Sequence, residues 1–127
     1  MKNKIIVSFL FLITMFSCVG LKETSLIKTE LYFGLSNKEG IISENSWQVF
    51  KRNHIDKIFN GYTIIDANGY WTDNNGSKIT EPSKLLIYIH KKSDAENTKI
   101  DSIINLYKVK FNQESVLKVE NKVKINF

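Results

Sequence analysis

The chain has 127 residues, of which 43% are hydrophobic and 24% charged, with one cysteine and a formal net charge of +5. A single cysteine excludes an intramolecular disulfide, and Arg52 is the only arginine among the 18 basic residues. If Lys2 and Lys4 are removed with a signal segment, the excess falls to +3, which is too small to predict nucleic-acid binding.

The N-terminus has the three-part order of a secretory signal. Two lysines precede an apolar run that ends at residue 16, and Ser17 stands directly before Cys18. As a helix this run would extend roughly 18 Å, well short of a hydrocarbon core of about 30 Å. The sequence therefore predicts a signal peptide over residues 1–17 rather than a transmembrane helix.

Cys18 stands where the mature chain would begin. The segment Met15-Phe16-Ser17-Cys18 resembles the lipobox of bacterial lipoproteins, although Phe16 is bulkier than the usual small residue. We expect cleavage before Cys18, lipidation of its thiol and anchoring to a membrane of the bacterial cell envelope, on the periplasmic side. The alternative is an ordinary secretory signal with an incidental cysteine. Residues 18–28 would form a short tether.

The rest of the chain, residues 29–127, is expected to form one domain. Residues 29–36 alternate apolar and other side chains, which predicts a strand, and residues 37–42 predict a loop. Ser43 can cap a helix that ends at Asn60-Gly61. Its apolar positions follow the helical period: Trp47, Phe50, Ile55, Ile58 and Phe59.

Residues 62–72 predict a second strand, in which Asn68-Gly69 indicates either a bulge or a separate turn. A turn at residues 73–76 leads to a third strand over residues 83–90, which is apolar on both faces and therefore expected at the centre of its sheet. Ser93 and Glu96 have capping-box spacing. The helix that they begin has the most regular apolar period: Ile100, Ile103, Ile104, Tyr107 and Phe111.

Residues 115–127 alternate apolar and charged side chains, as a half-exposed strand does. The element order β-α-β-β-α-β predicts an α+β, ferredoxin-like fold: a four-stranded antiparallel sheet with two helices on one face. Right-handed crossovers place the first and third strands in the centre, in the order fourth, first, third, second.

Motifs spread over residues 29–127 resemble those of one family. They are Leu31-Tyr32-Phe33-Gly34, Trp47, Phe50, Gly61, Asp66, Gly69, Trp71, Glu81-Pro82-Ser83-Lys84, Tyr107, Phe111 and Gln113-Glu114-Ser115-Val116-Leu117. The chain is similar to a family of small exported bacterial proteins known as domain of unknown function 3574. The resemblance implies export and one compact domain, and it implies no reaction. The chain departs from the family in its lysine-rich surface and in a short junction at residues 59–61.

The two histidines lie at no spacing typical of metal ligands, and no phosphate-binding or catalytic motif is present, so we expect no metal and no cofactor. His54 falls within the apolar stripe of the first helix. It is either an acid/base group lining a pocket between helix and sheet or a histidine at the edge of the core with one hydrogen bond.

A polar group enters the third strand at Glu81, Ser83 and Lys84, where Pro82 holds the backbone extended. We expect Glu81 and Lys84 to pair with each other or to contact Glu114 at the start of the last strand. The group is either a polar pocket at one end of the sheet or a network that orders the loops.

Aromatic side chains mark the two central strands. Tyr88 and His90 share one face of the third strand, and Tyr32 projects from one face of the first. If these faces coincide, the three rings form a platform for a second copy of the chain or for a small ligand. The alternative is that they pack under a loop or helix.

The last strand carries Lys118, Lys122 and Lys124 on one face, which we interpret as a solvated edge. Attraction of these lysines to anionic lipid headgroups is the weaker interpretation.

These patterns favour a non-enzymatic domain that binds a ligand or partner at the cell envelope. The expected partners are the membrane through Cys18, a second copy of the chain and a small molecule of unknown identity, but no nucleic acid. The alternative is a small-molecule enzyme similar to the dimeric ferredoxin-like monooxygenases and isomerases. Its acid/base groups would be His54, Glu81 and Lys84.

Overall fold

A computed structural model describes residues 26–126, so the expected signal peptide and Cys18 lie outside the described residues. Four strands form one antiparallel sheet in the order β4-β5-β1-β6. The strands are β1 (Leu26–Gly34), β4 (Thr63–Thr72), β5 (Lys78–Lys91) and β6 (Leu117–Val123). The predicted ferredoxin-like fold and strand order are confirmed, with β1 and β5 in the centre.

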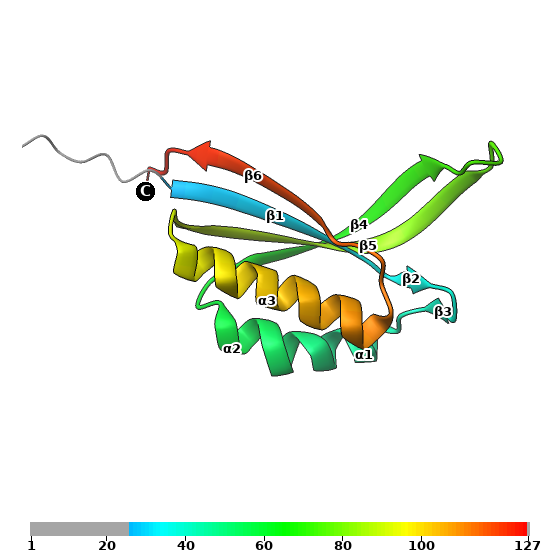
Figure 1. Ribbon diagram of the computed structural model, residues 1–127, viewed down its shortest axis with the longest axis horizontal. Helices are drawn as coiled ribbons and strands as arrows, with labels where there is room; N and C mark the ends of the chain where they lie inside the picture. Colours follow the sequence, from blue (N-terminus) through cyan, green and yellow to red (C-terminus); the bar gives the residue numbers. More distant parts are fainter. Residues whose placement is uncertain (1–25, 127) are drawn as a thin grey trace, which may run out of the picture.

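Both helical segments cover the same face of the sheet (Figure 1). The first consists of α1 (Glu44–Phe50), a π-helical turn η1 (Lys51–Ile55) and α2 (Asp56–Ile58), and the second is α3 (Asp94–Phe111). As predicted, Ser43 and Ser93 cap these segments, because each hydroxyl accepts a hydrogen bond from the N–H three residues on, at 3.2 Å. No helix within residues 26–126 is long and apolar enough to cross a membrane.

The strand ends differ from those expected. β1 begins at Leu26, so residues 26–28 of the expected tether belong to the sheet, and the alternation continues backward with Ile27 buried. Residues 37–42, expected to be a loop, contribute to a small hairpin of β2 (Ser36–Asn37) and β3 (Gly40–Ile41). Neither difference changes the topology.

Asn68 and Gly69 form neither a bulge nor a turn. Asn68 lies opposite Pro82 and Gly69 opposite Glu81, in a register that runs without a break from Thr63 to Thr72. β4 and β5 therefore continue as one long hairpin beyond the end of the helices, as Figure 1 shows.

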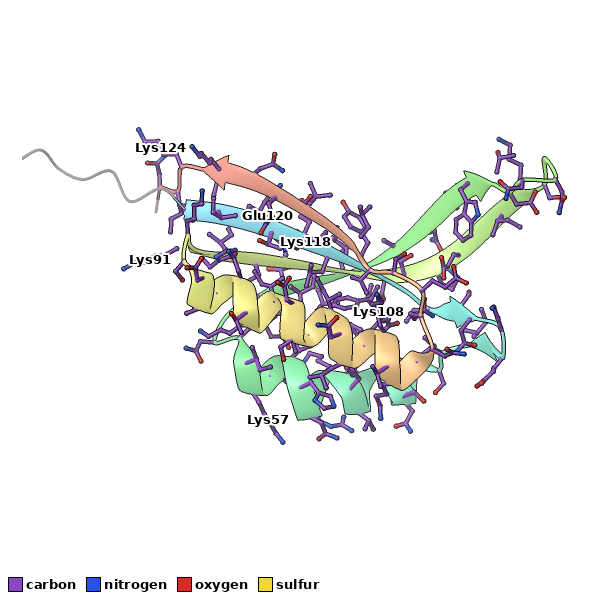
Figure 2. The ribbon with its side chains drawn as sticks, in the orientation of Figure 1. Lys57, Lys91, Lys108, Lys118, Glu120 and Lys124 are labelled. Atoms are coloured by element: carbon purple, nitrogen blue, oxygen red, sulfur yellow. The ribbon has the colours of Figure 1, made fainter. Side chains whose placement is uncertain are left out.

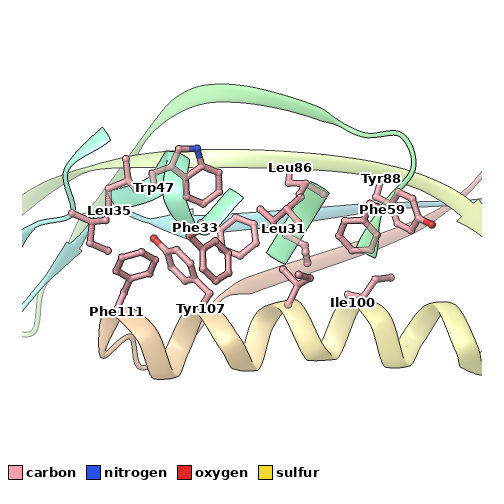
Figure 3. Packing of buried hydrophobic residues seen from close by; sticks show 14 residues of the cluster. Leu31, Phe33, Leu35, Trp47, Phe59, Leu86, Tyr88, Ile100, Tyr107 and Phe111 are labelled. Carbon is pink, nitrogen blue, oxygen red and sulfur yellow. The ribbon is translucent and has the colours of Figure 1, made fainter. Parts of the chain in front are cut away.

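The core lies between the sheet and the helices and is rich in aromatic rings (Figure 3). Phe33 of β1 lies with its ring centroid 4.7 Å from that of Tyr107 of α3 and 5.4 Å from that of Trp47 of α1. All buried members of this cluster lie between Leu31 and Phe111. Within residues 26–126 nearly all buried apolar side chains therefore form one continuous core, as expected of a single domain.

Within residues 26–126 no helix covers the opposite face of the sheet (Figure 1). Even-numbered residues of β1, such as Tyr32 and Gly34, and odd-numbered residues of β5, such as Ser83, share this face because they alternate with the buried core positions. We call it the open face. The apolar side of β6, which begins with Leu117, also belongs to it, since Leu117 lies opposite Tyr32.

Candidate functional site

A cleft of about 530 Å³ lies at one end of the open face. Its walls come from the end of β1, the β2 strand, the β4–β5 hairpin and the loop between α3 and β6. The lining residues are Tyr32, Gly34, Ser36, Asn37, Lys38, Trp71, Glu81, Ser83, Asn112, Gln113, Glu114, Ser115 and Leu117. Most of them belong to the motifs quoted above, although those motifs are far apart in the sequence.

Glu81 is the partly buried carboxylate of this cleft. Its Oε1 accepts a hydrogen bond from the Ser36 N–H at 3.1 Å. It lies against Gly34, where an added Cβ would approach Oε1 to 2.5 Å, so the absence of a side chain at position 34 makes room for the carboxylate. Within residues 26–126 Glu81 forms no salt bridge. Its remaining lone pairs can therefore accept hydrogen bonds from a ligand.

Tyr107 supports the same strand from the core side. Its hydroxyl donates a hydrogen bond of 2.7 Å to the Gly34 carbonyl. Burial and then the negative charge of Glu81 raise the pKa of Tyr107 far above its ordinary value, so the hydroxyl stays a donor at neutral pH. Gly34 thus separates a fixed donor in the core from a carboxylate in the cleft.

The loop after α3 forms the opposite wall and is tied down by side chains. Asn112 ends α3 in the left-handed conformation, with φ 51° and ψ 44°. Gln113 donates from Nε2 to the Ser36 carbonyl at 2.7 Å, and Asn37 donates from Nδ2 to the Phe111 carbonyl at 2.9 Å. These bonds hold the loop and the β2 strand at a fixed separation across the cleft.

Two aromatic side chains supply flat surface. Tyr32 is partly exposed, and Trp71 exposes 47% of its surface although it is one of the largest apolar side chains. Leu117, opposite Tyr32, is 59% exposed. A cleft that combines exposed rings with the carboxylates of Glu81 and Glu114 suits a compact ligand that has a flat or apolar part and a hydrogen-bond donor or positive charge.

Lys84 does not belong to this cleft, and the predicted pairing with Glu81 or Glu114 is wrong. Glu81 and Lys84 are three residues apart on one strand and therefore point to opposite faces. Lys84 is 6% exposed on the helix side and donates to Glu44 Oε2 and Asp66 Oδ1, at 2.6 Å each. Burial lowers the pKa of Lys84, but the hydrogen bonds to the two carboxylates outweigh it and raise the pKa.

Glu114 is exposed and lies 3.9 Å from Lys38, its closest basic group. Both line the cleft, as do Glu81 and Ser83. The structure thus brings three of the predicted polar residues to one end of the sheet and places Lys84 outside them.

His54 lies in the π-helical turn and is half-buried. Its ring centroid is 4.9 Å from that of Phe50, and it does not line the cleft. Its burial and its ring contact fit a histidine at the edge of the core, and the single hydrogen bond expected for it stays a prediction. The set of His54, Glu81 and Lys84 is not assembled into one site.

The three-ring platform does not form. Tyr88 and His90 are stacked, with centroids 4.9 Å apart, on the helix side of β5, where both are buried. Tyr32 lies opposite Leu85, on the other side of the sheet, so the faces do not coincide. Tyr88 donates to Glu96 at 2.6 Å, and burial followed by this contact raises the pKa of Tyr88 to about 12.

His90 completes a polar contact with buried Thr29. His90 Nε2 lies 2.8 Å from Thr29 Oγ1, and the Thr29 hydroxyl donates to Glu120 at 3.3 Å. Tyr88 and His90 therefore pack under α3, the second of the two expected arrangements. Within residues 26–126 no cluster of three or more histidine, cysteine or carboxylate side chains could hold a metal ion.

A family model matches the part of the chain that forms the cleft. The model of the family described as "Protein of unknown function (DUF3574)" matches residues 28–127. The chain belongs to this family. No curated protein is similar to it in sequence.

Solved structures share the fold of this DUF3574 chain. A phage SAM lyase in complex with S-methyl-5'-thioadenosine superposes with a TM-score of 0.58 at 18% identity, covering 78% of this chain and 81% of the lyase. The same lyase in its apo state gives a TM-score of 0.57 at 21% identity, covering 78% and 82%. CutA from Synechococcus elongatus gives 0.47 at 7% identity, covering 79% and 78%. At 18% and 21% identity the likeness to the lyase is one of fold.

Gly34, Trp71 and Gln113 line the cleft, but sequence reasoning did not single them out as site residues. Gly34 shares the open face with Tyr32 through strand alternation, which the sequence does show. Trp71 and Gln113 lie in the quoted motifs, and their convergence depends on the long β4–β5 hairpin and on the position of the α3–β6 loop.

Proposed function

We propose that this DUF3574 protein is a lipoprotein of the bacterial cell envelope, exported by its N-terminal signal and anchored on the periplasmic side through Cys18. Its domain binds a small ligand in the cleft at the end of the open face and carries out no reaction there. The observation that carries the proposal is the convergence of distant motifs on a cleft whose partly buried carboxylate, Glu81, forms no salt bridge within residues 26–126.

The anchoring half of the proposal rests on the sequence. Cys18 is the only cysteine, and it follows a signal of the expected order. The Cys18→Ser variant, expressed with its signal, should be lost from the membrane fraction. It should also take up no labelled fatty acid. A variant that stays in the membrane fraction like the wild type would contradict the anchoring.

The ligand half rests on the chemistry of the cleft walls. Glu81 offers a carboxylate already oriented by the Ser36 N–H at 3.1 Å, and Trp71 and Tyr32 offer ring surfaces. These groups suit an amine-bearing or otherwise cationic small molecule with a flat or apolar part. S-adenosylmethionine and S-methyl-5'-thioadenosine belong in the panel of probes, because the lyase that shares the fold binds the second of them.

Thermal shift of residues 19–127 against such a panel tests the ligand half. A compound that stabilises the wild type should stabilise the Glu81→Gln and Trp71→Ala variants much less. Tyr70→Ala is the matched control, since Tyr70 neighbours Trp71 on β4, is 75% exposed and does not line the cleft. Equal stabilisation of Trp71→Ala and Tyr70→Ala would place the ligand elsewhere.

The structure does not bring together the three residues expected as acid/base groups of an enzyme. Glu81 and Lys84 lie on opposite faces of the sheet, and His54 lies on the helix that covers one of them. A general acid and base must reach the same substrate, and these three side chains do not share a cavity. The geometry therefore supports binding over acid/base chemistry by this set.

A further inference from the structure

Four lysines gather at the end of the domain where β1 begins. Leu26, the first residue of β1, lies opposite Lys91 on one side and Val123 on the other. Lys92 follows Lys91, and Lys122 and Lys124 flank Val123. Figure 2 shows Lys91 and Lys124 at this end of the sheet. We call Lys91, Lys92, Lys122 and Lys124 the basic end.

We infer that the basic end is a contact surface for anionic lipid headgroups. It orients the domain so that this end faces the bilayer. The inference rests on the proposed anchoring through Cys18. It adds an orientation and a lipid preference, which the lipid anchor alone does not give.

Chain length limits where this end can lie. Cys18 and Leu26 are eight residues apart, so the start of β1 is at most about 29 Å from the anchored residue, whatever path the intervening chain takes. The basic end is thus the part of the domain closest along the chain to the proposed anchor. The cleft lies at the other end of β1, beside Gly34.

The basic end carries an excess of positive charge. Among residues 26–126 none of its four lysines forms a salt bridge, and all four are exposed. The acidic groups nearby are Asp94, Glu96 and Glu120. Glu96 is paired with Lys99 at 2.7 Å, and Glu120 accepts a hydrogen bond from Thr29 at 3.3 Å. Asp94 and Glu120 form no salt bridge with a lysine within residues 26–126, so four lysines and these two carboxylates leave a net charge of +2.

Two of the lysines face one space. Lys92, which follows β5, and Lys122, from β6, line the same hollow of about 190 Å³, together with His90, Asn97 and Glu120. A headgroup phosphate beside Lys92 and Lys122 could contact both, while Lys91 and Lys124 reach neighbouring headgroups. Lysine suits this task, since its flexible ammonium acts as a point charge for phosphate.

The test uses residues 19–127 without lipid, a fragment that keeps every residue of the described core. Co-sedimentation is measured with vesicles of phosphatidylcholine alone and of phosphatidylcholine with phosphatidylglycerol. Each lysine near an anionic surface contributes about fivefold in partitioning. The wild type should therefore bind the phosphatidylglycerol vesicles at least tenfold better, and high salt should abolish the difference.

The decisive variant replaces Lys91, Lys92, Lys122 and Lys124 with glutamine and should lose this preference. The matched control replaces Lys57, Lys78, Lys108 and Lys110, which removes the same charge away from the basic end. Equal binding by the two variants, or no preference by the wild type, would overturn the inference. The proposed function is tested by different experiments, the fractionation of Cys18→Ser and the ligand panel. A negative vesicle result therefore leaves the proposed function untouched. Free inorganic phosphate, added at matched ionic strength, should not displace the protein from the vesicles. Displacement would indicate a site for free phosphate and contradict a lipid-binding surface.

Discussion

The carboxylate of Glu81 occupies space that any side chain at position 34 would need. An ideal Cβ on Gly34 would lie 2.5 Å from Glu81 Oε1 and 2.9 Å from its Cδ. Strand β1 passes this point with ordinary backbone angles, so the glycine serves close approach rather than a turn. The carboxylate can therefore lie along the strand and accept the Ser36 N–H.

Gly34→Ala should move Glu81 without unfolding the domain. The added methyl group meets the far end of a flexible side chain, so we expect a loss of stability of about 1 kcal/mol, at the low end for an added methyl group. The Ser36 amide should lose its acceptor and exchange its hydrogen faster, as hydrogen-exchange measurements would show. Gly61→Ala is the control, because no atom of the described residues lies within 4 Å of an added Cβ there. Unchanged exchange at Ser36 would mean that Glu81 is not held by the space at Gly34.

Lys84→Met tests whether this lysine is structural. Its partners Glu44 and Asp66 expose 60% and 82% of their side chains, so both carboxylates can return to water when the ammonium is removed. We expect a loss of about 1 kcal/mol or less in denaturant unfolding, because methionine fills the same volume. Ligand binding in the cleft should not change. A large drop in ligand affinity with stability unchanged would place Lys84 in the site after all.

Strand and helix order could be predicted from the sequence because each element has a clear period. The alternation around Leu31 and Phe33 and the helical spacing of Ile100 to Phe111 are both set by one buried face. The handedness of the crossovers then leaves one strand order. These are local patterns combined with a general rule of topology.

The contents of the site could be predicted only in part. Glu81 and Ser83 lie at the expected end of the sheet, but the partner of Lys84 depends on the register of β4 against β5, which puts Asp66 opposite Lys84. Alternation within a strand shows which residues lie on the same face as Tyr88 or as Tyr32. It does not show whether those two faces lie on the same side of the sheet. That follows from the pairing of Thr29 with Tyr88, which one shift in register would reverse.

Glu96 should make stability depend on acid pH. Hydrogen bonds from Lys99 and then Tyr88 lower the pKa of Glu96 below its ordinary value of 4.5. A carboxyl with a lowered pKa contributes stability that is complete above its unfolded pKa and is lost as pH falls through its folded pKa. Glu96→Gln should therefore be less stable than the wild type at pH 7, and the gap should narrow as the pH falls below about 4.5.

Urea unfolding of both proteins across this pH range measures the gap. Glu114→Gln is the control, because Glu114 is exposed and its one lysine neighbour lies 3.9 Å away. The control should match the wild type at every pH. If the difference in free energy of unfolding between Glu96→Gln and the wild type grew as the pH fell, it would contradict a lowered pKa for Glu96.

The open face should pair with a second copy of the chain. Its apolar side chains include Ile65, Trp71, Ile89 and Leu117, each between 44% and 59% exposed. Several exposed apolar side chains that share one face are typical of an interaction site. On β1 the charged residues of this face, Lys28 and Glu30, pair with each other at 2.9 Å. In a two-fold arrangement such opposite charges can also pair between copies, because the same patch meets itself.

Ile89→Asp should abolish this dimer. Sedimentation velocity of residues 19–127 over a range of concentrations should show a dimer for the wild type and a monomer for the variant, since a buried aspartate without a partner is costly. Val109→Asp makes the same chemical change on α3, where the side chain is 85% exposed on the far side of the molecule. This control should dimerise like the wild type. A wild type that stays monomeric, or a control that dissociates equally, would mean that the open face is not the interface.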